Sequence, residues 1–504
     1  MQADRGFTLS HQKVALELGF SGVLAGFTEL TIVPTNAALR HIYLHARCMD
    51  IQRVLCNGQE VKFEYTDAVQ SLALSDIHGH AQLKRDLFSA TSQGAEGELR
   101  ISLPDHLHPE RASSGTEGNA DGEEFSMMTI RIDYVLEDVQ EAIQVIQPTA
   151  DAPYRVPHMY TRPLGLNSSR CWVPCLDSLW DRCTWELEYV VPRRLSVDMG
   201  DLDDTTPEIY VISSGELTEH AVHPENPEKS VFYYTQQVAT SVQHVAFCAG
   251  PFVMTRLSPA GIQTCETLSF CLPEHEHELR STTQFAWQAI EYISSEYGSY
   301  PFGSFKLVFV DGTHEDCHTA STLAICSSDL LHPPSVIDQA FENRHILSHA
   351  VAFQWVGINI IQKTWADTWL IHGLSQYLAS MFLRCLLGNN EYRFQMKKDC
   401  DRLCHWDIGM PPLYQAGRDE PLDPQLLSFV NLKAPLVLYL LDRRLCKMGA
   451  SLGLGRVIPK VFLQAITGEM SNNALGTHSF LRTCKKVSSA DLRLFMDQWI
   501  NGSG

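Results

Sequence analysis

Residues 344–378 constrain the fold of this chain more than any other stretch, because two apolar helical segments here carry histidines at fixed spacings. His349 and Phe353 are four residues apart, so a helix would place both side chains on one face. The second segment carries Trp369, His372 and Gly373. Two histidines on such a helix pair could together hold a metal ion, although structural zinc sites almost always use four protein ligands and catalytic sites three.

The composition is that of a large globular protein of 504 residues, enough for two to four domains at ~150 residues each. Its 15 cysteines show no secreted disulfide pattern and no apolar leader precedes them, which favours a reducing, intracellular compartment. The sequence has no run of 18 or more apolar residues, so we expect no membrane span. The net charge of −20 argues against a surface devoted to nucleic acid and leaves a local basic patch open.

The first half of the chain has the period-two alternation of an antiparallel β-domain. Residues 8–75 alternate between apolar and polar, and Asn57-Gly58 predicts a hairpin turn between strands at 51–55 and 61–65. Residues 76–98 look irregular. The polar, acidic segment 104–124 predicts a mobile loop inserted between strands at 99–103 and 125–135.

From about residue 276, the apolar spacing changes to that of helices. The fold class is therefore α+β and multidomain, with a β-domain over 1–257 and a mostly helical domain over 258–504. The expected helices are 278–296, 338–357, 364–388, 390–406, 424–448 and 453–467.

The helix pair resembles the zinc site of the gluzincin aminopeptidases. Gln354-Trp355-Val356-Gly357 and Trp369-Leu370-Ile371-His372-Gly373 are similar to their Q-W-F-G and W-L-N-E-G motifs. The resemblance implies a saddle- or sandwich-like β-domain, followed by a thermolysin-like helical domain with a small mixed sheet. In the enzymes' H-E-x-x-H frame, His349 is the first ligand, Ala350 stands at the general base and Phe353 at the second ligand.

The same resemblance leaves the other chemical positions vacant. His372 stands where the third ligand would be a glutamate, and Asn431 stands at the tyrosine that stabilises the oxyanion. The glutamate that anchors the substrate amine aligns with Thr319 or a neighbour. Since alanine accepts no proton and phenylalanine binds no metal, we expect no catalytic residue, no metal and no cofactor. His349 is then a partly buried histidine with local hydrogen bonds.

A narrower resemblance comes from Asn-Ser-Ser-Arg-Cys-Trp-Val-Pro-Cys-Leu-Asp-Ser at 167–178 and Cys-Thr-Trp-Glu-Leu-Glu at 183–188. These stretches resemble the aminopeptidase-like subunit family of the general transcription factor TFIID, the large TATA-binding-protein-associated factor. The family implies a nuclear, non-catalytic scaffold that supports complex assembly and recognition of the core-promoter initiator. Its implied partners are other TFIID subunits, including histone-fold subunits and the largest subunit. The family implies no association with a membrane. Promoter DNA stays open as a partner, through a local basic patch or the C-terminal part. The family's C-terminal β-sandwich and helical solenoid are expected to be absent from this chain.

Two other functions remain open: a soluble zinc aminopeptidase-like enzyme with an unusual two-histidine site, and an inactive module that still binds peptides.

Other polar and cysteine clusters in the sequence are interpreted without a functional site. Cys171 with Cys175, and Cys400 with Cys404 and His405, have spacings that zinc sites use, but we interpret these cysteines as small packed hydrophobes. His275 with His277, the run 311–318 and four basic pairs are interpreted as solvated surface; the pairs are 193–194, 397–398, 443–444 and 485–486.

Overall fold

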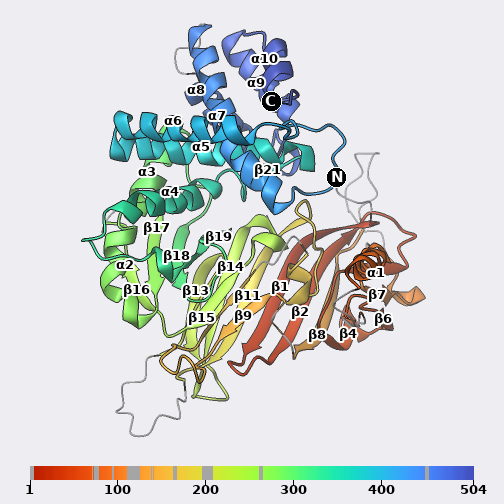
Figure 1. Cartoon of the computed structure of the whole chain (residues 1–504). Helices are drawn as coiled ribbons and strands as arrows, with labels where there is room; N and C mark the ends of the chain where they lie inside the picture. Colours follow the sequence, from red (N-terminus) through yellow and green to blue (C-terminus); the bar gives the residue numbers. More distant parts are fainter. Residues whose placement is uncertain are drawn as a thin grey trace. The chain divides into compact units, whose positions relative to one another are not determined.

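A computed structural model describes most of the chain in two compact units, residues 2–253 and residues 254–504 (Figure 1). The described residues are 5–70, 72, 79–93, 96–109, 125–137, 139, 141–162, 167–195, 208–259, 265–448 and 453–503. Most of the predicted mobile insertion, residues 110–124, lies outside them. The aminopeptidase resemblance predicts the domain boundary near residue 257, and the two units divide after Val253.

The first unit is built on an eight-stranded sheet of order β13-β14-β11-β1-β2-β8-β4-β5. Its strands alternate buried and more exposed residues, as in β8, which is why period two was readable in the sequence. The strands are β1 (Phe7–Leu18), β2 (Leu24–Pro34), β4 (Asp50–Cys56), β5 (Gln59–Glu60), β8 (Met128–Leu136), β11 (Arg182–Pro192), β13 (Glu216–Val222) and β14 (Lys229–Ser241).

The first strand lies inside this sheet, with a distant strand beside it. β1 pairs antiparallel with β2 and parallel with β11, so His11 lies opposite Thr184. The buried Gln12 side chain donates to Thr28 Oγ1 at 2.9 Å and to the Pro174 carbonyl at 3.0 Å. The β-domain is therefore not purely antiparallel, because β1 and β11 run in the same direction.

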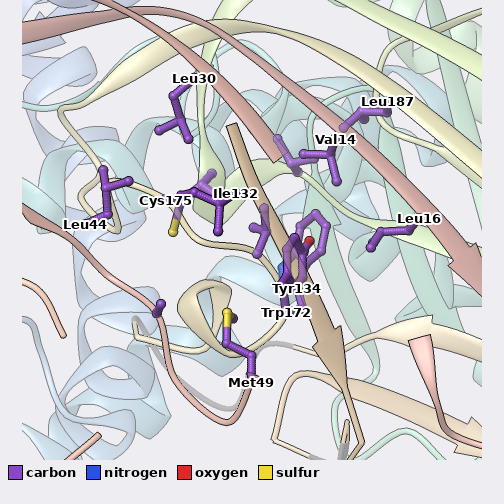
Figure 2. Close-up of a cluster of buried hydrophobic side chains, with 14 of the residues drawn as sticks. Val14, Leu16, Leu30, Leu44, Met49, Ile132, Tyr134, Trp172, Cys175 and Leu187 are labelled. Carbon is purple, nitrogen blue, oxygen red and sulfur yellow. The ribbon is translucent and has the colours of Figure 1, made fainter. Parts of the chain in front are cut away.

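Two smaller sheets share a hydrophobic core with one face of the large sheet. Figure 2 shows part of this core, where Tyr134 and Trp172 lie among aliphatic side chains. Tyr134 Oη donates to the Trp172 carbonyl at 3.1 Å. One small sheet has the order β3-β7-β6 and the other β12-β15-β10-β9. Their strands are β3 (His41–Leu44), β6 (Phe63–Tyr65), β7 (Leu99–Ser102), β9 (Ile143–Ile146), β10 (His158–Thr161), β12 (Tyr210–Ser213) and β15 (Phe247–Gly250).

A buried ion network explains the charged positions of the 167–178 motif. Arg170 Nε donates to Asp177 Oδ2 at 2.9 Å, and its Nη1 donates to Glu98 Oε1 at 3.1 Å. Arg47 Nε donates to the same Glu98 oxygen at 2.6 Å. The Arg170 side chain is 7% exposed and those of Glu98 and Asp177 at most 2%. Two guanidinium groups thus compensate two desolvated carboxylates.

The second unit combines a five-stranded sheet with a group of helices. The sheet has the order β16-β17-β18-β20-β19. At its β19 edge, β19 and β20 form an antiparallel hairpin with a two-residue turn. The strands are β16 (Val253–Arg256), β17 (Glu266–Cys271), β18 (Ser304–Val310), β19 (Cys317–Ala320) and β20 (Leu323–Ser327). The helices are α2 (Glu276–Thr283), α3 (Ala286–Glu296), α4 (Asp338–Phe353), α5 (Thr368–Leu387), α6 (Asn389–Trp406), α7 (Pro424–Lys447), α8 (Leu454–Ile466), α9 (Thr477–Ser488) and α10 (Arg493–Trp499).

Two long apolar helices, α7 and α5 extended back to Trp365, have the length and composition of a membrane span. They pack closely on each other: a Cβ added at Gly373 of α5 would lie 2.9 Å from the Ala434 Cβ of α7. About half of each apolar window is buried within the protein. This packing is typical of core helices in a large domain.

Several local predictions were wrong. The segment 76–98 contains a helix, α1 (His80–Gln93), in which polar residues outnumber apolar ones. The predicted helix 278–296 is broken between α2 and α3, and the predicted helix 338–357 ends at Phe353. The Asn57-Gly58 turn is present, with φ values of 49° and 79°. Its second arm is only β5, because residues 63–65 pair with β7 in another sheet.

Breaking the buried ion network should destabilise the first unit strongly. Arg170→Ala leaves the Asp177 carboxylate buried without its cation, which should cost about 3–5 kcal/mol in the free energy of unfolding. Arg53→Ala removes a similar pair with Asp133, but the Arg53 side chain is 50% exposed, so this control should cost less than about 1 kcal/mol. Urea denaturation followed by circular dichroism would compare the two variants. Equal losses would contradict the role given to the network.

Candidate functional site

Three helices bring the sequence-predicted positions together in the second unit. His349 and Phe353 come from the last two turns of α4, His372 from α5 and Asn431 from α7. The close approach of α5 and α7 at Gly373 places Asn431 near the His372 ring. All four side chains are half-buried. The predicted constellation therefore exists in space as well as in sequence.

The Phe353 ring contacts both imidazoles. Its centroid lies 5.6 Å from that of His349, in an edge-to-face arrangement, and 5.7 Å from that of His372. The same ring fills the space above Gly357, where an added Cβ would lie 2.5 Å from three of its atoms. Gly357 also has φ +142°, which only glycine adopts readily. The phenyl ring thus occupies the centre of the group.

A serine that belongs to none of the predicted positions hydrogen-bonds to His349. Ser375 Oγ lies 3.0 Å from His349 Nε2 and donates its proton to the His372 carbonyl at 2.9 Å. A hydroxyl has one proton, so when Ser375 donates it to the carbonyl, His349 Nε2 is the donor to Ser375. The Nε2 lone pair is then unavailable for a metal ion. The only sequence signal was a serine three residues after His372, a spacing at which a helical hydroxyl reaches a carbonyl.

Both histidines are neutral at physiological pH. Burial lowers the pKa of His349 to about 3, and the neighbouring His372 and His345 lower it further in the same direction. Burial also lowers the pKa of His372 to about 4, against a smaller opposing effect of Asn431. Among the residues that the structure describes, His372 Nδ1 and Asn431 Oδ1 are buried without a hydrogen-bond partner of normal geometry. The site therefore disfavours positive charge.

These residues do not fit the zinc ion of the aminopeptidase-like frame. A catalytic zinc site needs three protein ligands and a carboxylate base for the bound water. Phe353 offers no ligand atom, His349 Nε2 is bonded to Ser375, and Ala350 is a buried alanine. Asn431 supplies an amide where a phenol would stabilise an oxyanion. The arrangement therefore lacks the carboxylate base and the three protein ligands that the zinc mechanism needs.

The landmark residues of the motifs have structural roles instead. Gln354 Oε1 accepts from the Thr322 amide and its Nε2 donates to the Ala320 carbonyl, both at 2.9 Å. Trp355 Nε1 donates to the Gly298 carbonyl at 2.9 Å. Trp369 Nε1 donates to Thr477 Oγ1 at 3.1 Å. These contacts join the helix pair to the edge hairpin and to α9, so the motif residues hold neighbouring elements together.

The remaining candidates do not join this group. Thr319 is half-buried in β19, opposite Ala324 of β20. Cys171 and Cys175 are buried, as expected of small packed hydrophobes. The same expectation was wrong for Cys400 and Cys404, which are exposed because α6 buries none of its residues.

In three of the four basic pairs, one residue forms a salt bridge with a nearby acid. Arg193 pairs with Glu208 at 3.1 Å, Lys397 with Asp401 at 3.7 Å and Arg443 with Asp442 at 3.0 Å. Local carboxylates reduce the attraction that such pairs could exert on phosphate groups. The expected solvated surface accounts for them.

One polar cluster was not anticipated. Glu274, His275 and Asp311 place one ligand atom each within 4.8 Å of one another, and no other group of three such residues does so in the described ranges. Glu274 is exposed and the other two are half-buried. Exposed acidic groups commonly cluster without an ion, so we assign no site here.

The sequence has extensive relatives in other organisms. It is 34% identical over 548 residues to transcription initiation factor TFIID subunit 2 of Schizosaccharomyces pombe, an alignment that covers 98% of this chain. The chain belongs to the TFIID subunit 2 family. The Drosophila melanogaster subunit is 28% identical over 99% of this chain. The chain spans less than half the length of these relatives, 45% and 42% respectively. No family model matches the sequence.

Solved structures give the fold of this family member. Yeast LTA4 hydrolase superposes with a TM-score of 0.70 over 99% of this chain and 69% of its own, at 14% identity. The M1 zinc metallopeptidase of Deinococcus radiodurans superposes with a TM-score of 0.66 over 99% of this chain and 94% of its own, at 17% identity. The predicted α+β, aminopeptidase-like fold is confirmed.

Removing the Gln354 amide should loosen the site. Gln354→Ala removes the buried hydrogen bonds to the Thr322 amide and the Ala320 carbonyl, which should cost about 1–3 kcal/mol. Gln395→Ala is the matched control, because Gln395 bonds only to Glu391 on its own helix. Denaturant titrations should show a large loss for the first variant and a small one for the second. Equal losses in the two variants would contradict the stabilising role given to the Gln354 side chain.

Acid should destabilise the second unit through its buried histidines. The folded pKa values of about 3 and about 4 lie below the unfolded value of ~6.5. The unfolded chain therefore binds more protons, and stability is lost progressively as pH falls below ~6.5 towards the folded values. His372→Gln should reduce the drop in melting temperature between about pH 7.5 and about pH 5. His405→Gln, at an exposed position of α6, should leave it unchanged. An unaltered drop in His372→Gln would contradict this assignment.

Proposed function

We propose that this chain is a non-catalytic scaffold part of TFIID, which supports assembly of the complex and initiator recognition in RNA polymerase II transcription. The family relationship supports a role in transcription initiation, since the relatives carry that name. The chain covers less than half of the length of those relatives. We therefore propose that this part of the subunit contributes to the function of the whole. The fold would then serve as an interaction platform.

One observation carries the non-enzymatic part of the proposal: the Phe353 ring occupies the place between His349 and His372. A phenyl ring there excludes the ligand that the second histidine would supply, and the Ser375 hydrogen bond engages the first histidine. Losing one group could weaken an enzyme, but removing the base, a ligand and the oxyanion donor together removes the mechanism. No residue of this site is proposed as catalytic and none as a metal ligand.

The proposed partners are other TFIID subunits, including the histone-fold subunits and the largest subunit, and the proposed location is the nucleus. A net charge of −20 favours protein partners over extended contact with DNA. The local pairing of Arg193, Lys397 and Arg443 with acids points the same way. Contact with promoter DNA would need a local basic patch, or the region of the relatives that this chain does not span.

Purified protein should contain far less than one zinc per chain and should not hydrolyse aminoacyl-anilide substrates. The physical reason is the absence of a third ligand and of a base at Ala350. Elemental analysis and a chromogenic assay measure the two properties, with His349→Ala as the matched variant. Stoichiometric zinc together with turnover that His349→Ala abolishes would favour the enzyme instead.

Tagged protein should co-purify TFIID subunits from nuclear extract. The M1 metallopeptidase of Deinococcus radiodurans, which shares the fold at 17% identity, is a suitable control bait. Quantitative mass spectrometry should find the subunits enriched on this chain and absent from the control. Failure to enrich them would contradict the scaffold role, and capture of peptides in their place would favour a peptide-binding module.

A further inference from the structure

Two cysteines face each other across the β19–β20 hairpin. Cys317 Sγ and Cys326 Sγ are 3.1 Å apart, and the residues are directly opposed in the antiparallel register. Cys326 is buried, whereas Cys317 is half-buried. Neither takes part in the site around His349. The pair therefore needs an explanation of its own.

The register of the hairpin suits a cross-strand disulfide. The Ser327 amide donates to the Asp316 carbonyl at 2.9 Å, so these opposed residues form a hydrogen-bonded pair. The next pair, Cys317 with Cys326, is then of the non-hydrogen-bonded kind, in which Cα atoms are about 4.5 Å apart and side chains lie close. Disulfides accept Cα separations of ~4.4–6.8 Å. The two sulfurs can thus be joined with little movement of the backbone.

The hairpin holds this register at both ends. Next to the cysteines, the Asp316–Ser327 bond closes the open end. At the turn, Gln354 binds the Ala320 carbonyl and the Thr322 amide. β19 is the last strand in the described order of its sheet, so Cys317 lies on an edge that a small reagent can approach. The arrangement has an accessible thiol next to a buried one on a preorganised frame.

We propose that Cys317 and Cys326 are a reversible dithiol–disulfide pair whose oxidant is a low-molecular-weight disulfide of the glutathione class. The Cys317 thiolate attacks one sulfur of the oxidant, forming a mixed disulfide and releasing one thiolate. The Cys326 thiolate then attacks the Cys317 sulfur, forming the internal disulfide and releasing the second. The two protons of the protein thiols pass to the released thiolates, so the protein loses two electrons and the oxidant gains them.

An internal comparison is available on α6. Cys400 and Cys404 are exposed and four residues apart on a helix. Their Cβ atoms are expected about 5–6 Å apart, beyond the ~3.5–4.5 Å of a disulfide. They should therefore react with glutathione singly without closing a bond to each other. Cys385, also exposed, provides a variant that should not affect the hairpin.

The test uses the full chain with oxidised glutathione, followed by alkylation of free thiols and peptide mass spectrometry. The expected product is a linked peptide containing Cys317 and Cys326, two hydrogen masses lighter than the dithiol and restored by dithiothreitol. Cys317→Ser and Cys326→Ala should each abolish it completely, whereas Cys385→Ser should leave it unchanged. Alanine is chosen at the buried position so that the core is kept, and circular dichroism verifies folding.

Three results would overturn the proposal. In the first, Cys317 carries glutathione while Cys326 is still alkylated, so the second step does not occur. In the second, both thiols stay free at an oxidant concentration that modifies Cys400. A linked product that survives in the folded Cys317→Ser variant would also overturn it, since it would involve other cysteines.

Discussion

The Gln354 carboxamide is the contact on which the centre of the second unit depends. One side chain at the end of α4 satisfies both a donor and an acceptor in the β19–β20 turn. The turn includes Thr322, whose φ of +59° is unusual for a β-branched residue, so the backbone there needs support. Helix, hairpin and histidine group are positioned together by this contact. A buried amide that makes all of these bonds stabilises a single arrangement.

The residues that build the aminopeptidase-like frame differ from those at the positions of the catalytic base and metal ligands. Trp355, Trp369 and Gly373 contribute hydrogen bonds and close helix packing, which any chain with this fold needs. A catalytic base or metal ligand costs stability because it must be desolvated. Replacing it with Ala350 or Phe353 removes that cost. The frame can therefore persist without the chemistry, because its hydrogen bonds and packing stabilise it.

The sequence predicted those features whose cause is local. Strands such as β8 alternate in burial, and α5 is apolar enough to be recognised by its composition. It did not predict α1, which has few apolar residues to mark a face, or the transfer of residues 63–65 to another sheet. At the site, motif spacing identified His349, Phe353, His372 and Asn431. Ser375 was missed because its bond to His349 is a tertiary contact.

The parallel pairing of β1 with β11 has a consequence for how the protein is made. β1 emerges from the ribosome first, yet one of its two neighbours in the sheet is not synthesised until residues 182–192. Until then, one edge of β1 has unsatisfied backbone groups and exposes apolar side chains. Folding of the first unit during translation must therefore wait for most of that unit. The nascent chain is a natural client for chaperones that bind extended apolar segments.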